Sequence, residues 1–178
     1  MALSKFNADR IVGISAMIIS LSSLIVFIYQ TKLMREHQYQ SVYPYLSVTT
    51  ERFGFPNPAI ILTNDGIGPA IIVSSVITYK GEKYETDLPS FLFDNYPEAD
   101  SIANLVYTNI KAGQLIPAGQ RLQIITIDET EDMESANLLF QVLQKLDKDD
   151  VGWDIIYRDI YDNKWALTGE NEFPVKVK

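Results

Sequence analysis

One uncharged stretch near the start, residues 11–29 (IVGISAMIISLSSLIVFIY), constrains this chain more than any other feature. A helix rises about 1.5 Å per residue, so the stretch would extend roughly 28 Å, close to the ~30 Å hydrocarbon core of a bilayer. Arg10 precedes it, and Lys32 and Arg35 follow it. We therefore predict a short tail at residues 1–10 and a single transmembrane helix at residues 11–30, with nearly all of the chain on one side.

A cleaved signal peptide and a buried core helix are the alternative interpretations of this stretch. A signal peptide has a shorter apolar core of about 7–15 residues, followed by small residues at a cleavage site. Here the apolar run is longer, and residues 27–31 (FIYQT) contain no such site. A helix packed on one side of a soluble domain would carry a polar stripe, whereas the polar groups here are serine hydroxyls. These observations favour a retained anchor.

Small residues recur along the predicted membrane helix at spacings of three and four. They are Gly13, Ala16, Ser20 and Ser23. Residues at these spacings share one face of a helix, and small side chains allow two helices to approach closely. The pattern predicts self-association of membrane helices, although small residues scattered along a lone helix would look the same.

The remainder of the chain has the composition of one acidic domain. Residues 31–42 favour a helical stem, and residues 43–178 have the length of an ordinary domain. Of 15 Lys and Arg and 23 Asp and Glu, four basic and two acidic residues precede residue 38, which leaves 11 and 21, a net charge of −10. Phosphate binding requires a basic surface, so this balance argues against a nucleic acid partner.

The sequence offers little for catalysis or metal binding. It has no cysteine, which excludes disulfides, thiol nucleophiles and cysteine-based metal sites. The single histidine, His37, lies in the stem rather than in a pocket where a catalytic triad would need it. Residues 66–68 lack the phosphate-loop pattern, and residues 147–150 lack the ligand spacing of a calcium loop. We therefore expect no enzymatic activity, no cofactor and no metal ion.

Short β-rich segments separated by turn residues dominate the domain. We expect strands at 44–52, 59–63, 70–79, 121–127, 153–158 and 164–168. An irregular insertion at 88–109 should contain helical turns at 89–93 and 98–105. An amphipathic helix is predicted from Thr130, as N-cap, to Lys148, with an apolar stripe of Met133, Ala136, Leu139, Phe140, Leu143 and Leu146. The prediction is a mainly β fold, a β-sandwich carrying one amphipathic helix and an irregular helical insertion.

Two groups of domain residues carry specific predictions. The first should form a structural turn in which glycine supplies positive φ angles: Asn64, Gly66, Gly68 and Pro69. The second is a set of aromatic residues near both ends of the domain: Tyr43, Tyr45, Trp153, Tyr157, Tyr161 and Trp165. Core packing is the default for aromatic residues, and an exposed group of them would be a binding face.

The order of several segments resembles a group of uncharacterised bacterial single-pass membrane proteins with an N-terminal anchor and an immunoglobulin-like β-sandwich domain. The segments are residues 11–29, 31–40 (TKLMREHQYQ), 41–46 (SVYPYL), 62–72 (LTNDGIGPAII), 116–120 (IPAGQ) and 155–165 (IIYRDIYDNKW). The resemblance implies a bacterial inner (cytoplasmic) membrane, with the domain on the cytoplasmic side. The Lys and Arg residues flanking the span are equal in number on its two sides, so the positive-inside rule leaves the orientation open.

Two functional hypotheses follow. The first is a membrane-anchored, non-enzymatic protein-interaction module that contacts the bilayer through residues 11–30 and binds a protein partner or a second copy of itself. The alternative is a self-associating membrane sensor or effector subunit, whose soluble domain binds a ligand and whose transmembrane helices cluster.

Overall fold

The computed structural model of the chain describes residues 8–51, 58–128, 133–169 and 173–177. It divides into two compact units, Met1–Ser41 and Val42–Lys178.

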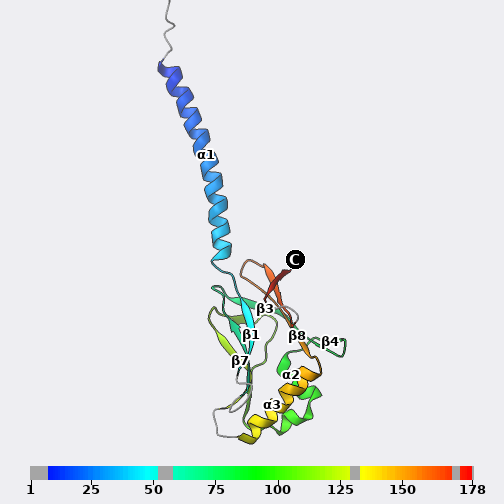
Figure 1. Cartoon of the computed structure of the whole chain (residues 1–178). Coiled ribbons are helices and arrows are strands. Elements are labelled where there is room, and N and C mark those ends of the chain that lie inside the picture. The colour runs from blue at the N-terminus through cyan, green and yellow to red at the C-terminus, as the bar shows by residue number, and fades with distance from the viewer. Residues whose placement is uncertain (1–7, 52–57, 129–132, 170–172, 178) are drawn as a thin grey trace, which may run out of the picture. The chain divides into compact units, whose positions relative to one another are not determined.

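The first unit contains a single continuous helix, α1 (Ala8–Gln40). Among the described residues it is the one helix long and apolar enough to cross a membrane, and its most apolar window is 0% buried within the chain. Hydroxyl groups along it bond back to carbonyl oxygens one turn earlier, as Ser15 Oγ does to Ile11 O at 2.7 Å. Such back-bonding lets a polar side chain lie in an apolar environment. The predicted membrane helix and stem are thus parts of one element (Figure 1).

The second unit is built on two antiparallel sheets of ten described strands. The first, sheet A, has the order β1 (Leu46–Glu51), β2 (Ala59–Asn64), β7 (Arg121–Ile127), β5 (Leu105–Tyr107). The second, sheet B, has the order β10 (Val175–Val177), β9 (Lys164–Leu167), β8 (Gly152–Arg158), β3 (Ala70–Tyr79), β4 (Glu82–Tyr84), and β6 (Leu115–Ile116) pairs with the start of β3. The six strands expected from the alternating pattern are present, and the short strands β4, β5, β6 and β10 lie outside those expected ranges.

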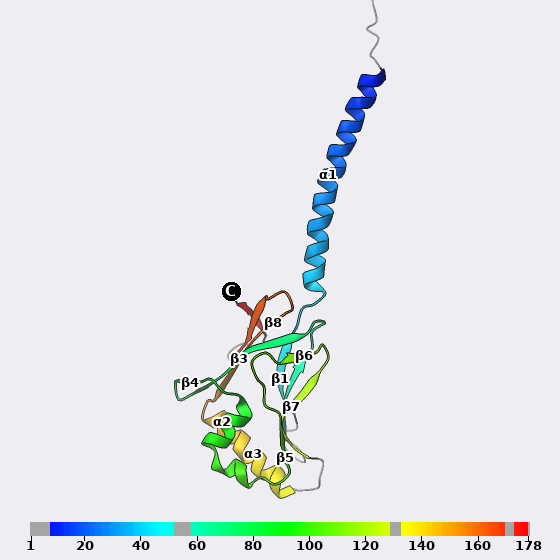
Figure 2. The same cartoon turned by 180° about the vertical axis from the view of Figure 1, so that it is seen from behind.

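Helices α2 (Leu88–Asn95) and α3 (Met133–Lys148) lie together at one end of the sheets (Figures 1 and 2). Asp87 caps α2 by accepting a hydrogen bond from Ser90 N at 3.1 Å. The helical turn predicted at 98–105 is instead a 3-10 helix, η1 (Pro97–Ser101), because the chain then extends into β5. The predicted N-cap of α3, Thr130, lies outside the described residues.

The apolar stripe of α3 is largely as predicted, with Met133 and Phe140 as exceptions and Val142 as an omission. Phe140 is only half-buried. Ala136, Leu139, Leu143 and Leu146 are buried, and Val142 joins them. Met133 is 56% exposed, so its assignment to the stripe was wrong. It is the first residue of the helix, where the buried face has only begun.

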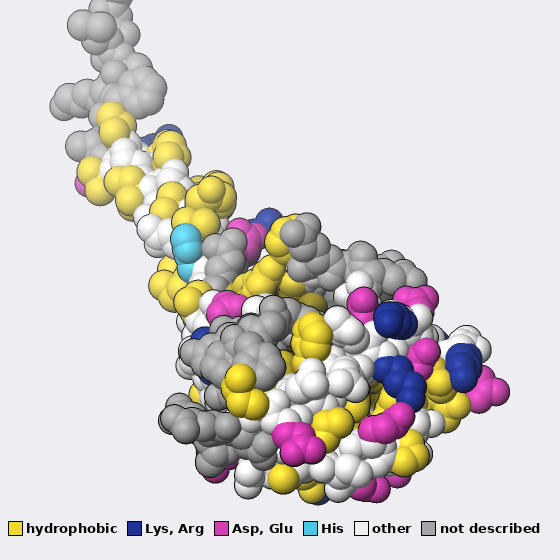
Figure 3. All heavy atoms as spheres, turned by 60° about the horizontal axis from the view of Figure 1, so that its bottom comes forward, with side chains coloured by type: hydrophobic (Ala, Val, Ile, Leu, Met, Phe, Trp, Pro, Cys, Tyr) yellow, Lys and Arg dark blue, Asp and Glu magenta, His cyan; other side chains and the backbone are white. Residues whose placement is uncertain are grey.

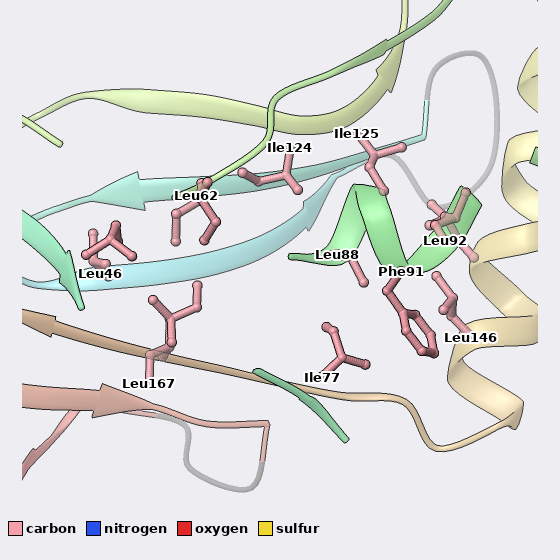
Figure 4. Close-up of a cluster of buried hydrophobic side chains, with 14 of the residues drawn as sticks. Leu46, Leu62, Ile77, Leu88, Phe91, Leu92, Ile124, Ile125, Leu146 and Leu167 are labelled. Carbon is pink, nitrogen blue, oxygen red and sulfur yellow. The ribbon is translucent and has the colours of Figure 1, made fainter. Parts of the chain in front are cut away.

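Both sheets and both helices of the second unit supply one apolar core. In Figure 4, Leu62 of sheet A and Leu167 of sheet B point toward one another, and Phe91 of α2 and Leu146 of α3 belong to the part of the same cluster that lies at the helices. Leu62 and Phe91 are 0% and 1% exposed. Burying side chains of this size supplies the main favourable term in folding, about 1.5–3 kcal/mol each relative to exposure.

The turn between β2 and β3 is held by the buried side chain of Asn64. Its Oδ1 accepts hydrogen bonds from Tyr45 N and Gly66 N at 3.1 Å, and its Nδ2 donates to Gly68 O at 2.9 Å and Ile116 O at 3.0 Å. One amide therefore joins three segments that are distant in sequence, and all its polar groups are satisfied.

The reason for the two glycines in this turn differs from the prediction. Neither Gly66 nor Gly68 has a positive φ. A Cβ atom on Gly66 would collide with Tyr43 O and Tyr45 N, and one on Gly68 would collide with Val42 O. Close approach of two backbones, rather than a left-handed conformation, requires glycine here. Pro69 follows this contact and leads directly into β3.

We predict that Gly68→Ala lowers the free energy of unfolding by at least about 2 kcal/mol, because backbone atoms must move to admit the methyl group. Gly152→Ala is the control, since its Cβ would meet Thr78 Cβ at an ordinary 3.6 Å. It should change stability by less than about 1 kcal/mol. Denaturant unfolding of the full chain in detergent, followed by the fluorescence of Trp153 and Trp165, measures both. Equal stability of the two variants would contradict the close-approach explanation.

Candidate binding groove

A groove of about 480 Å³ opens between the two sheets on the side where sheet A ends at β1. One wall is the edge of sheet A, the other is formed by β8 and β9 of sheet B, and residues of α2 and α3 complete it. The lining residues are Ser47, Val48, Thr50, Ile60, Leu88, Leu143, Leu146, Asp147, Val151, Trp153, Leu167, Thr168 and Gly169.

The sheet A wall follows from the alternation of side chains along β1. Leu46, Val48 and Thr50 are two residues apart and share the face that is turned toward sheet B. Leu46 is 0% exposed, whereas Val48 is 40% exposed. The inner face of β1 is therefore covered at its start and uncovered further along, where it lines the groove.

Backbone hydrogen bonding shows which groups of β1 face away from β2. Asp65 N donates to Tyr45 O at 2.8 Å, while Leu46 N donates to Tyr157 Oη at 3.2 Å, away from β2. The register between β1 and β2 is unbroken from Leu46 to Glu51. In an antiparallel pair these directions alternate, so the N–H and C=O groups of Val48 and Thr50 also point away from β2. No strand among the described residues pairs with β1 on that side.

The opposite wall is apolar and fixed in place. Trp153 Nε1 donates to Ser75 Oγ at 2.9 Å, which orients the indole ring. Leu167 is 8% exposed, and Leu143 and Leu146 of α3 are 3% and 7% exposed. These side chains are already packed in the core and show only their outer surfaces to the groove, so this wall is preformed.

The hydroxyl of Tyr157 is bonded to the outward backbone N–H of Leu46, at the start of β1. The ring of Tyr157 is fully buried and stacks on Trp165 with ring centroids 6.0 Å apart. Burial raises the pKa of the Tyr157 phenol above its usual range, so the hydroxyl stays protonated at physiological pH. Its oxygen accepts the hydrogen bond from the backbone of Leu46. The open part of the edge thus starts at Val48.

Asp147 is the one charged side chain among the described residues that line the groove. It lies in the last turn of α3, where the helix dipole disfavours a negative charge, so it does not serve the stability of the helix. The face of the domain shown in Figure 3 also carries acidic side chains, with individual Lys and Arg side chains among them. Within the part of the chain that the structure describes, no three His, Asp or Glu side chains are placed to share a metal ion.

The structure separates the aromatic residues that the sequence grouped together. Tyr157 and Trp165 are 0% and 6% exposed, so these two do not belong to an exposed binding face. Tyr43 packs edge-on against Trp165 with ring centroids 5.2 Å apart, and Tyr45 is next to Tyr43 at 6.4 Å. Trp153 lines the groove. Tyr161 is 45% exposed, in the turn between β8 and β9.

The other predicted residues lie in α1 or in the β2–β3 turn. Gly13, Ala16, Ser20 and Ser23 are all exposed along α1, and their role in helix packing stays a prediction. Sequence reasoning missed the importance of Val48 and Thr50. The alternation of residues 46–51 (LSVTTE) identifies a strand, but it does not tell whether the strand lies at an edge.

Comparisons of the chain with models of protein families, with curated proteins and with solved structures give no match.

We predict that Tyr157→Phe lowers the free energy of unfolding by about 1–3 kcal/mol, because the buried N–H of Leu46 loses its acceptor. Tyr107→Phe makes the same change at a side chain that is 48% exposed and should alter stability by less than about 0.5 kcal/mol. Denaturant unfolding of both variants checks this. If Tyr157→Phe were no more damaging than Tyr107→Phe, the hydrogen bond would not hold the start of β1.

Proposed function

We propose that the protein is a membrane-anchored, non-enzymatic protein-interaction module, with α1 as its single membrane span. The observation that carries the proposal is the apolar groove beside the open edge of β1. Free backbone N–H and C=O groups at a sheet edge are best satisfied by another polypeptide backbone. An apolar lining next to them offers contact area for the side chains of the same polypeptide.

The strand orders support an immunoglobulin-like sandwich for the domain. In the constant-type immunoglobulin fold, strands A, B, E and D form one sheet, and strands G, F and C form the other. The order β1-β2-β7-β5 corresponds to A-B-E-D, and β9-β8-β3 corresponds to G-F-C. In this correspondence α2 and η1 are an insertion before strand D, and α3 is an insertion between strands E and F. The groove then lies on the side of the sandwich where strand A is the edge.

The second candidate is a self-associating sensor or effector, in which a small ligand fills the groove and the α1 helices cluster. The apolar lining of the groove is compatible with such a ligand. Unlike the protein-interaction module, this candidate requires association of the α1 helices. Gly13→Leu together with Ala16→Leu would abolish a ligand-dependent oligomer, whereas it would leave binding of a protein partner to the groove unchanged.

We predict that Thr50→Lys strongly reduces capture of a protein partner, while Thr49→Lys does not. Both residues are exposed neighbours on β1, but Thr50 lines the groove and Thr49 points to the opposite face. A lysine on an edge strand is well tolerated for folding and hinders strand pairing. The measurement is affinity purification of the tagged full-length chain in mild detergent from its native cells, with quantitative mass spectrometry.

The expected result is at least about a tenfold loss of one stoichiometric partner with Thr50→Lys only. Partners that are unchanged with both variants would rule out the groove as the binding site. A loss with both variants would indicate that any added charge on β1 disturbs the protein, and unfolding curves of the two variants would show it.

A further inference from the structure

We propose that the groove binds its partner by strand addition. An extended partner segment would pair with β1 as a fifth strand of sheet A, insert alternate apolar side chains into the groove, and place a Lys or Arg against Asp147. This inference rests on the proposed function and adds to it the backbone pairing and the chemistry of the partner.

The edges of the two sheets differ in a way that singles out β1. Among the described strands, the other edges are formed by β5, β10, β4 and β6, which have at most three residues each. Strand β1 has six residues, contains neither proline nor lysine, and keeps an unbroken register with β2. Short strands, prolines, lysines and bulges are the usual means of blocking unwanted pairing. The long, regular edge of β1 has none of them.

The position of this edge beside the groove gives an added strand something to pack on. A new strand would lie about 4.8 Å from β1 and accept and donate hydrogen bonds at Val48 and Thr50. Its inward side chains would cover the exposed inner face of β1 and meet Trp153 and Leu167 of sheet B, which line the opposite wall. The same few residues of the partner would thus make both the backbone hydrogen bonds to β1 and the apolar contacts in the groove.

Charge indicates the chemistry of the partner and argues against a second copy of this chain. The only charged lining residue among those described is Asp147, and its side chain makes no hydrogen bond or ion pair with another described residue. A cationic side chain in the partner segment would complement it. Pairing of β1 with β1 of a second copy would instead bring two Asp147 carboxylates and two acidic domains together, which like-charge repulsion disfavours.

The direct test is amide hydrogen exchange of the full chain in detergent micelles, resolved by residue with NMR. The probe is a capped peptide in which valine and threonine alternate between two terminal lysines, and the same peptide with terminal glutamates is its control. In the free protein, the amides of Val48 and Thr50 should exchange quickly and that of Thr49 slowly. The lysine peptide should slow exchange at Val48 and Thr50 by at least about tenfold.

Three variants separate the parts of the proposal. Thr50→Pro removes the outward N–H without breaking a hydrogen bond to β2, and it should bind the lysine peptide roughly fivefold to tenfold more weakly than Thr50→Val, which keeps the N–H. Asp147→Asn should remove a preference of about twofold to fivefold for the lysine peptide over the glutamate peptide.

The outcomes that would overturn the inference are distinct. Binding without protection of Val48 and Thr50 would refute strand pairing, as would failure of the lysine peptide to bind at millimolar concentration. Equal affinity for the two peptides would refute the cationic partner. Protection of these amides in the free protein that disappears on dilution would assign the edge to a second copy. If strand pairing failed while Thr50→Lys still removed a cellular partner, the proposed function would stand and only the binding mode would be wrong.

Discussion

The edge of a β-sheet carries backbone N–H and C=O groups that are bonded only to water unless something covers them. In this protein sheet A ends at β1, and the outward groups of Val48 and Thr50 face the groove between the sheets. The groove depends on β1 being an edge strand, because a further strand beside β1 would cover the inner face of β1 that lines the groove. Binding of a protein partner and strand addition at β1 would both satisfy these edge groups.

The groove is preformed because buried polar groups fix the segments around it. The side chain of Asn64 ties the entry of the chain at Tyr45 to the β2–β3 turn and to Ile116. The hydroxyl of Tyr157 crosses from sheet B to the backbone of Leu46 in sheet A. Both connections lie in the interior, where a lost partner costs more than an exposed hydrogen bond contributes. They set where β1 begins and how it faces sheet B, and therefore where its open part starts.

Glycine illustrates how a residue type can be identified correctly and its physical role misjudged. The segment from Asn64 to Pro69 has the composition of a turn, and it is a turn. Its glycines were expected to adopt positive φ, but Gly66 and Gly68 are needed because the backbone of residues 42–45 passes too close for a Cβ atom. A glycine in the sequence can indicate that a side chain is not tolerated at that position. Only the neighbouring segment, distant in sequence, gives the reason.

Elements whose causes are local can be predicted from the residues alone. The uncharged run at residues 11–29, the alternation in residues 70–79 and 121–127, and the apolar spacing of α3 each predict an element, because helix and strand periodicities follow from backbone geometry. Three properties depend on neighbours that are distant along the chain: Tyr157 and Trp165 are buried, Trp153 lines a groove, and β1 is an edge strand. A strand has the same local pattern at the edge and in the centre of a sheet, since pairing is made by residues far away along the chain. For that reason the candidate site, unlike most of the fold, became visible only once the sheets were assembled.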